Sequence, residues 1–567
     1  MNLTAQPSAT TARSLPPGDD TPLALAEFGP TAQTMSLVAF TAVATITLLL
    51  CVLTGPDRHN RDELDELDEF YTGYRGLSPF RGGLAIAGDY ISAATVLGTV
   101  GVIALTGYDG VVLALSTGLS LVLLMFLLAE PLRNAGRFTM GDAIGRRLPG
   151  RSVRIAVCGA TIAALLPMML VQLAGAGDLV AFVLGFDNAG LKTGCIVGLG
   201  VLMISYAAIG GMKGTALIQL VKMVMLLGSG AVVAGLVMSR FGWSPGELVA
   251  AAEKGSGAGP AYLRSGLQFT DSWSPRIDMI SSELTVVLGG ACLPHVTMRM
   301  YASRSATEVR RSMSWAVSAV VVFILLIAVI GFGASALVGR ELIAGSDPQG
   351  NTALLLGTQG ALGPDVTTVE ALVFTAMATT IFLTVLASVA GMILACANSL
   401  AHDVFAHRGK RISARTEMTL ARVSALAIGV PTIVLATFAQ HRTLQPLVVL
   451  SFSLGASALA PALVYGLFWR RFTRAGLLCT LIGGTTGSIV LMTGTNLVSG
   501  SPGSAFPGMD FNWFPFTTTG IVSIPLGFLL GWLGTVLSPR VRRTAQRRQY
   551  EAVERRILAG AVRREQG

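Results

Sequence analysis

Charged residues are scarce in this chain, and their scarcity excludes a soluble fold. Asp, Glu, Lys and Arg make up 13% of the 567 residues, whereas 52% are hydrophobic, and the mean hydropathy is +0.64. A soluble core cannot bury that much apolar surface, so the composition indicates an integral membrane protein. The net charge of +9 is then a signal of membrane topology and not of nucleic-acid binding.

Paired cysteines and catalytic signatures are missing as well. The six cysteines lie scattered through apolar runs without CxxC spacing, which argues against disulfides and against a metal cage. We find neither HExxH nor GxSxG on a plausible turn. We therefore expect no enzyme, no cofactor and no metal beyond a transported ion.

Thirteen apolar runs are each long enough to form a helix across a bilayer core about 30 Å thick. They span 33–54, 84–106, 111–130, 156–182, 194–211, 217–238, 280–298, 314–338, 368–401, 419–438, 445–468, 476–495 and 516–537. The sequence therefore predicts an all-α integral membrane protein with about 13 transmembrane helices. The predicted transmembrane domain, 33–537, follows a disordered tail, 1–32, and precedes an Arg-rich tail, 538–567.

Lys and Arg alternate between successive gaps of this pattern. Of the 41 Lys and Arg residues, 31 fall in every second gap, eight fall in the others, and two, Lys222 and Arg422, lie within runs. Because basic residues concentrate in cytoplasmic loops, the richer gaps face the cytosol. An odd number of spans then places the tail 1–32 outside the cell membrane. The tail 538–567 lies in the cytosol, where anionic lipid attracts its Arg residues.

Two runs carry residues that weaken a helix. The second run reads LAIAGDYISAATVLGTVG, and the seventh contains VVLGGACLPHVTMR. Backbone groups freed at membrane depth are tolerated only where they are buried in protein or line a cavity. Two such segments, five helices apart, are typical of transporters with inverted repeats. We therefore expect broken helices that open two repeats, 84–238 and 280–468; the alternative is that the glycines only permit close helix packing.

Several motifs in this order resemble the sodium:solute symporter family, and within it the acetate permease and monocarboxylate branch. They are LAIAGDYISAATVLG followed by GYDG, AEPLRNAGRFTMGDAIGRR, GGMKGTALIQLVK, LPHVTMRMY and NSLAHDVF. The resemblance extends from about Glu69 to Arg474 and implies a leucine-transporter-type five-plus-five inverted repeat. It also implies a secondary active, cation-coupled symporter that imports acetate or a similar short-chain monocarboxylate, such as pyruvate or propionate, by alternating access. Alternatives are a symporter of another small organic solute, such as an amino acid or a vitamin acid, and a passive anion channel.

The same resemblance implies a cation-binding site between the second and ninth runs. The second run supplies two carbonyls, and the ninth supplies a carbonyl and two adjacent hydroxyls. The matching positions are Gly88, Ile91, Thr384, Ala387 and Ser388. Ala387 stands where one hydroxyl is usual, and a hard cation prefers several oxygens. Both sodium and a proton therefore stay open as the coupling ion.

Four further polar residues lie in or next to the runs. Gln219 stands where many relatives carry an acid, and Lys222 follows three residues later. We interpret Lys213 and Lys222 as interfacial residues whose side chains extend toward water. Asp89 is the acid placed most deeply in an apolar run, so it is a candidate for carrying a coupling proton. The alternative is that Asp89 caps the half-helix or pairs with an Arg.

The predicted substrate site lies between the two broken runs. Thr95 lies where sugar-transporting relatives contact substrate, and it would bind a carboxylate together with backbone amides at the half-helix N-termini. Gly289 and Gly290 replace the aromatic gate of those relatives, which predicts a small pocket. We interpret four polar residues near the ends of the seventh and ninth runs as structural: His295, Arg299, His402 and Asp403.

Overall fold

The computed structural model describes residues 30–53, 63–184, 189–269, 272–363, 368–407, 412–439, 443–501 and 503–560. These residues form helices and no strand beyond one isolated bridge. The predicted tail 1–32 lies outside the described residues except at its end, where α1 begins at Pro30.

The α-helices up to the second broken run are α1 Pro30–Leu53, α2 Glu63–Thr72, α3 Pro79–Tyr90, α4 Ala93–Thr106, α5 Tyr108–Leu123, α6 Ala129–Ala135, α7 Met140–Arg147, α8 Arg151–Leu184, α9 Ala189–Arg240, α10 Pro245–Gly255, α11 Pro275–Cys292 and α12 Pro294–Met298. Those that follow are α13 Ala306–Leu337, α14 Arg340–Ser346, α15 Ala353–Leu362, α16 Thr368–Asn398, α17 Ala414–Ala439, α18 Gln445–Leu454, α19 Ala460–Phe468, α20 Arg474–Thr493, α21 Gly520–Val536 and α22 Arg540–Ala559.

The described helices agree with a polytopic membrane protein. Ten segments are long and apolar enough to cross a bilayer, and the bent pair of α3 and α4 gives an eleventh. α9 covers two predicted runs in 52 residues and is interrupted at Gly211, whose φ is 51° and ψ −152°. α21 matches the last predicted run but has only 17 residues. The all-helical membrane architecture is confirmed, and the count of thirteen spans stays a prediction.

Among the ten described spans, α16 is the most deeply buried. The whole of its most apolar stretch is buried, and α1, α8, α9 and α17 pack against it. α3 packs on both α9 and α13. The two helices implied in cation binding, α3 and α16, are therefore both in contact with α9.

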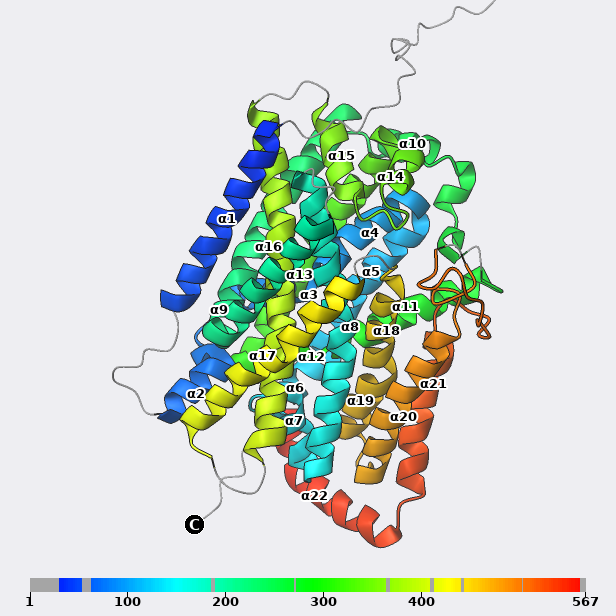
Figure 1. Ribbon diagram of the computed structural model, residues 1–567. Helices are drawn as coiled ribbons and strands as arrows, with labels where there is room; N and C mark the ends of the chain where they lie inside the picture. Colours follow the sequence, from blue (N-terminus) through cyan, green and yellow to red (C-terminus); the bar gives the residue numbers. More distant parts are fainter. Residues whose placement is uncertain are drawn as a thin grey trace, which may run out of the picture.

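The two ends of the bundle differ in their helices. Figure 1 shows α7 and α22 at one end and α10 and α14 at the other. Arg147 of α7 is buried, and its guanidinium donates to the carbonyls of Tyr465, Gly466 and Trp469 at 2.9, 2.5 and 2.6 Å, which satisfies the open end of α19. The same guanidinium lies 4.2 Å from the ring centroid of Tyr550. The Arg-rich tail thus includes a helix, α22, that packs on this end.

Candidate functional site

The first helix break separates α3 from α4 and bends the chain by 64°. Ile91 and Ser92 are extended, with ψ values of 100° and 168°, and the Oγ of Ser92 accepts from the Thr95 amide at 3.2 Å. The last carbonyls of a helix lack intrahelical partners. Gly88 brings this end of α3 onto α9, because a Cβ at Gly88 would lie only 2.6 Å from the Gln219 carbonyl oxygen. The open carbonyls of α3 therefore lie beside α9.

Lys222 of α9 binds those carbonyls. Its Nζ donates to the carbonyl oxygens of Gly88 and Ile91, each at 2.5 Å, and to Ser388 Oγ of α16 at 3.0 Å. The side chain is fully buried, with 0% exposure. The interpretation of Lys222 as an interfacial residue extending toward water is therefore wrong. α9 continues unbroken from Met212 past Lys222, and this face of it packs between α3 and α16.

Most of the predicted cation-binding residues lie close together in the structure, but their oxygens accept hydrogen bonds from N–H groups of protein side chains. Gly88, Ile91 and Ser388 bind Lys222, and the Ala387 carbonyl accepts from Gln219 Nε2 at 2.9 Å. Thr384 donates instead to the Thr380 carbonyl within α16, at 2.7 Å. The role of the five residues in binding a transported cation stays a prediction.

Asp89, the residue after Gly88 in α3, lies in a buried ion pair. Its carboxylate accepts from Arg299 Nε and from Gln219 Nε2, and the exposures of Asp89 and Arg299 are 1% and 3%. The Arg299 guanidinium also donates to the Met212 carbonyl at 3.2 Å and to Thr215 Oγ1 at 3.3 Å. The pairing alternative for Asp89 is thus realised, and Arg299 has the expected structural role. Proton coupling through Asp89 stays a prediction.

A small cavity lies where the two broken helices meet. The cavity is lined by the predicted Thr95, by residues of six other helices and by one residue of each helix break. These are Tyr90, Ser92, Thr95, Thr117, Met168, Leu293, His295, Met392 and Phe452. Leu293, with φ −60° and ψ 128°, is the extended residue that separates α11 from α12. Two amides at the start of α4 already have partners, because Ala93 donates to Gln172 Oε1 at 3.3 Å and Thr95 to Ser92. Side chains of the cavity, more than these amides, are therefore placed to bind a ligand.

His295, which the sequence analysis interprets as structural, is one of the residues that line the cavity. It directly follows Pro294 at the start of α12, its exposure is 2%, and its Nδ1 is buried without a hydrogen-bond partner. An unpartnered buried polar atom is costly. The signal in the sequence was the position of His295 just after a predicted helix break.

The two predicted pocket glycines serve helix contacts in the structure. A Cβ at Gly289 would lie 2.2 Å from the Phe452 carbonyl oxygen, and one at Gly290 would lie 2.5 Å from Ser120 Oγ and 3.0 Å from Tyr90 Oη. Neither glycine is among the described residues that line the cavity. Each contacts a residue that does, so their influence on pocket size stays a prediction.

A polar cluster joins the end of α16 to α7. His402 Nδ1 lies 2.6 Å from Glu417 Oε1, and its Nε2 lies 3.0 Å from Asp142 Oδ1. Arg154 bridges Asp142 and Asp403, at 2.9 and 3.0 Å. Burial alone would raise the pKa of Asp142, but the hydrogen bonds and charges of His402 and Arg154 outweigh it and hold that pKa well below its usual value. His402 and Asp403 thus connect helices, in agreement with a structural role.

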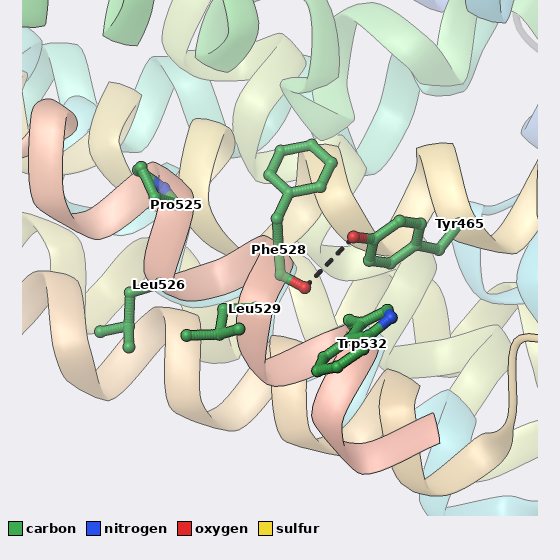
Figure 2. Close-up of a pocket in the computed structure, with 6 residues that line it drawn as sticks. All are labelled: Tyr465, Pro525, Leu526, Phe528, Leu529 and Trp532. Carbon is green, nitrogen blue, oxygen red and sulfur yellow. Dashed lines mark hydrogen bonds between the residues drawn. The ribbon is translucent and has the colours of Figure 1, made fainter. Parts of the chain in front are cut away.

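Figure 2 shows a second depression, formed by Tyr465 and one face of α21. It is lined almost entirely by apolar side chains, among them Leu529 and Trp532, which are about half exposed. Tyr465 Oη donates to the Phe528 carbonyl at 3.2 Å. An apolar surface of this kind on an apolar helix of a membrane protein suits contact with lipid tails. It contains none of the predicted site residues.

Comparison with known proteins gives consistent matches over most of the chain. Residues 70–484 match the pattern of the sodium:solute symporter family. The chain is 34% identical to a monocarboxylic acid transporter of Corynebacterium glutamicum over 517 residues, which cover 89% of this chain and 91% of that protein. It is 35% identical to the uncharacterized symporter YwcA of Bacillus subtilis over 506 residues, 89% of this chain and 94% of that protein.

A solved structure shares the fold at low sequence identity. A Na+-coupled sialic acid symporter in a substrate-bound, outward-open state has a TM-score of 0.67 and 13% identity, over 89% of this chain and 98% of that one. This likeness confirms the predicted transporter fold of the leucine-transporter type with broken helices.

Proposed function

This chain belongs to the sodium:solute symporter family, and from that premise we propose that it imports acetate or a similar short-chain monocarboxylate by alternating access, driven by a cation gradient. Membership makes it a transporter of a small solute and not an enzyme. It supports Na+ as the coupling ion and indicates no other cofactor. Acetate, pyruvate and propionate are the substrates that we propose.

The observation that carries this proposal is the cavity between the broken helices. Ser92 and Thr95 offer hydroxyls, and His295 offers a buried Nδ1 without a partner. Tyr90, Met168, Met392 and Phe452 make the remainder bulky and largely apolar, which favours a small substrate. The described lining contains no Lys, Arg, Asp or Glu. It therefore offers hydrogen bonds to one carboxylate, but no cation for a second carboxylate and no anion for the ammonium of an amino acid. The relative named as a monocarboxylic acid transporter supports the same substrate class.

Competition against labelled acetate tests the substrate class. In proteoliposomes, propionate and pyruvate are expected to compete with acetate, and succinate is not, because its second charge would lie unpaired in the cavity. Strong inhibition by proline or glucose, with none by propionate, would contradict the assignment and favour another small organic solute. Accumulation against a gradient that an ionophore abolishes would distinguish a symporter from a passive anion channel.

We also propose that the N-terminus faces the outside and the C-terminus the cytosol. The proposal is supported by the Arg-rich gaps and by the position of α7 and α22 at one end of the bundle (Figure 1). Reporter fusions after Arg147, Arg311 and Arg415 are expected to score cytosolic, because basic loops stay in the cytosol. A fusion after Gly259, which follows α10 at the opposite end, is expected to score external. A cytosolic signal at Gly259 would contradict this topology.

A further inference from the structure

We propose that the Lys222 ammonium is itself the cation at the position where the family resemblance implies sodium, so that this position does not bind Na+ in this transporter. The inference rests on the proposed symport function, but it concerns one position only. It leaves the coupling ion free to bind elsewhere in the molecule. In this proposal, Gly88, Ile91 and Ser388 bind the ammonium of a side chain instead of a metal ion.

The first argument is the match between donors and acceptors. A lysine ammonium has three N–H donors and no acceptor. Lys222 Nζ has three oxygen partners, the carbonyls of Gly88 and Ile91 and the hydroxyl of Ser388. Each of its donors therefore has an acceptor, and the three oxygens come from both helices that the resemblance implies. A sodium ion at the same point would need these oxygens, and the positive charge of Lys222 would repel it.

The second argument is that the two remaining positions of the predicted set are also engaged. The Ala387 carbonyl accepts from Gln219 Nε2 at 2.9 Å, and Thr384 Oγ1 donates within its own helix. Gln219 is neutral and stands where relatives carry an acid. Replacing that acid by an amide, and adding a lysine one turn later, removes the negative charge that a metal ion would favour and supplies a positive charge instead.

The third argument is the charge balance around Lys222. Asp89 of α3 and Arg299 neutralise each other, and His295 of α12 is the other titratable group near Lys222. α16 contributes Ser388 here, and its one charged residue, Glu370, lies near its first turn. A buried positive charge without a counterion is costly. A substrate carboxylate in the cavity, which begins at Ser92 directly after Ile91, would supply the missing negative charge.

Binding of radioactive sodium to the purified full-length protein tests the inference independently of the substrate. We expect Lys222→Ala, which frees the three oxygens, to gain saturable Na+ binding that the wild type lacks at this position. Lys213→Ala removes a partly exposed lysine of the same helix and is the matched control that should gain none. If the wild type binds Na+ elsewhere, Ser388→Ala in the wild-type background should leave that affinity unchanged. A wild-type affinity for Na+ that Ser388→Ala weakens by about tenfold, the effect of one lost ligand, would overturn the inference.

Acetate counterflow separates this inference from the proposed function. Counterflow needs no ion gradient, so its absence from the wild type with every cation tested would overturn the acetate assignment and leave the sodium-binding result standing. We expect counterflow by Lys222→Ala to fall roughly tenfold or more in choline buffer, because a charged hydrogen-bonding group is lost, and to recover in part when Na+ is added. If Lys222→Ala does not fold, the effect of Ser388→Ala on Na+ affinity decides alone: no change supports the inference, and weakening overturns it.

Discussion

A leucine in place of Arg299 is expected to destabilise the folded protein by about 3–5 kcal/mol, the usual effect of breaking a buried ion pair by removing one partner. Asp89 is 1% exposed and would keep only its hydrogen bond from Gln219. The change also removes the donors that hold the Met212 carbonyl and Thr215. The measurement is the melting temperature of purified protein in detergent, which should fall by many degrees or be replaced by aggregation.

Two control variants test whether the expected loss of stability comes from the buried charge. Arg310→Leu removes an arginine that also pairs with a carboxylate, Glu130, at 2.9 Å, but its side chain is 60% exposed. We expect that variant to lose about 0–1 kcal/mol. The double variant Asp89→Asn/Arg299→Leu should recover part of the loss, because the Asp89 carboxylate is no longer left buried without its arginine partner. Equal melting temperatures for Arg299→Leu and Arg310→Leu would show that the Asp89 pair contributes nothing to stability.

The helix breaks could be predicted because glycine, serine and proline act on the backbone locally. Ser92 is a good N-cap and begins α4 after the extended Ile91. Pro294 has no amide to donate, so α11 ends just before it and α12 begins with it. Hydropathy could likewise identify the apolar runs. It could not decide whether neighbouring runs form separate helices, and α9 continues through two of them with only a kink at Gly211.

The role of Lys222 could not be predicted because hydropathy gives no direction to a side chain. The residue lies near the start of an apolar run, where a lysine usually reaches water. Its burial depends on the packing of α9 between α3 and α16, which is a tertiary contact. One signal was available: Gln219 and Lys222 are three residues apart and share a helix face. That face contacts the residues to which the family resemblance assigns cation binding.

Replacing His295 with leucine is expected to raise the acetate concentration for half-maximal counterflow by about tenfold to a hundredfold. A hydrogen bond to a charged group contributes about 1.5–3 kcal/mol. A loss of that size in binding free energy weakens the affinity by about tenfold to a hundredfold. His295→Gln keeps an N–H donor of similar length and should retain more of the affinity. His407→Leu removes an exposed histidine outside the cavity and should change the affinity little.

The stability of the same variants distinguishes a substrate contact from a structural one. If His295 only stabilised the helix break, leucine would lower the melting temperature and leave the affinity of the folded fraction unchanged. Because its Nδ1 has no partner in the fold, leucine removes an unsatisfied polar atom, and any fall in the melting temperature should be small. A loss of acetate affinity at full stability would therefore identify His295 as a substrate ligand. A lowered melting temperature with normal affinity would return it to the structural role that its sequence position first indicated.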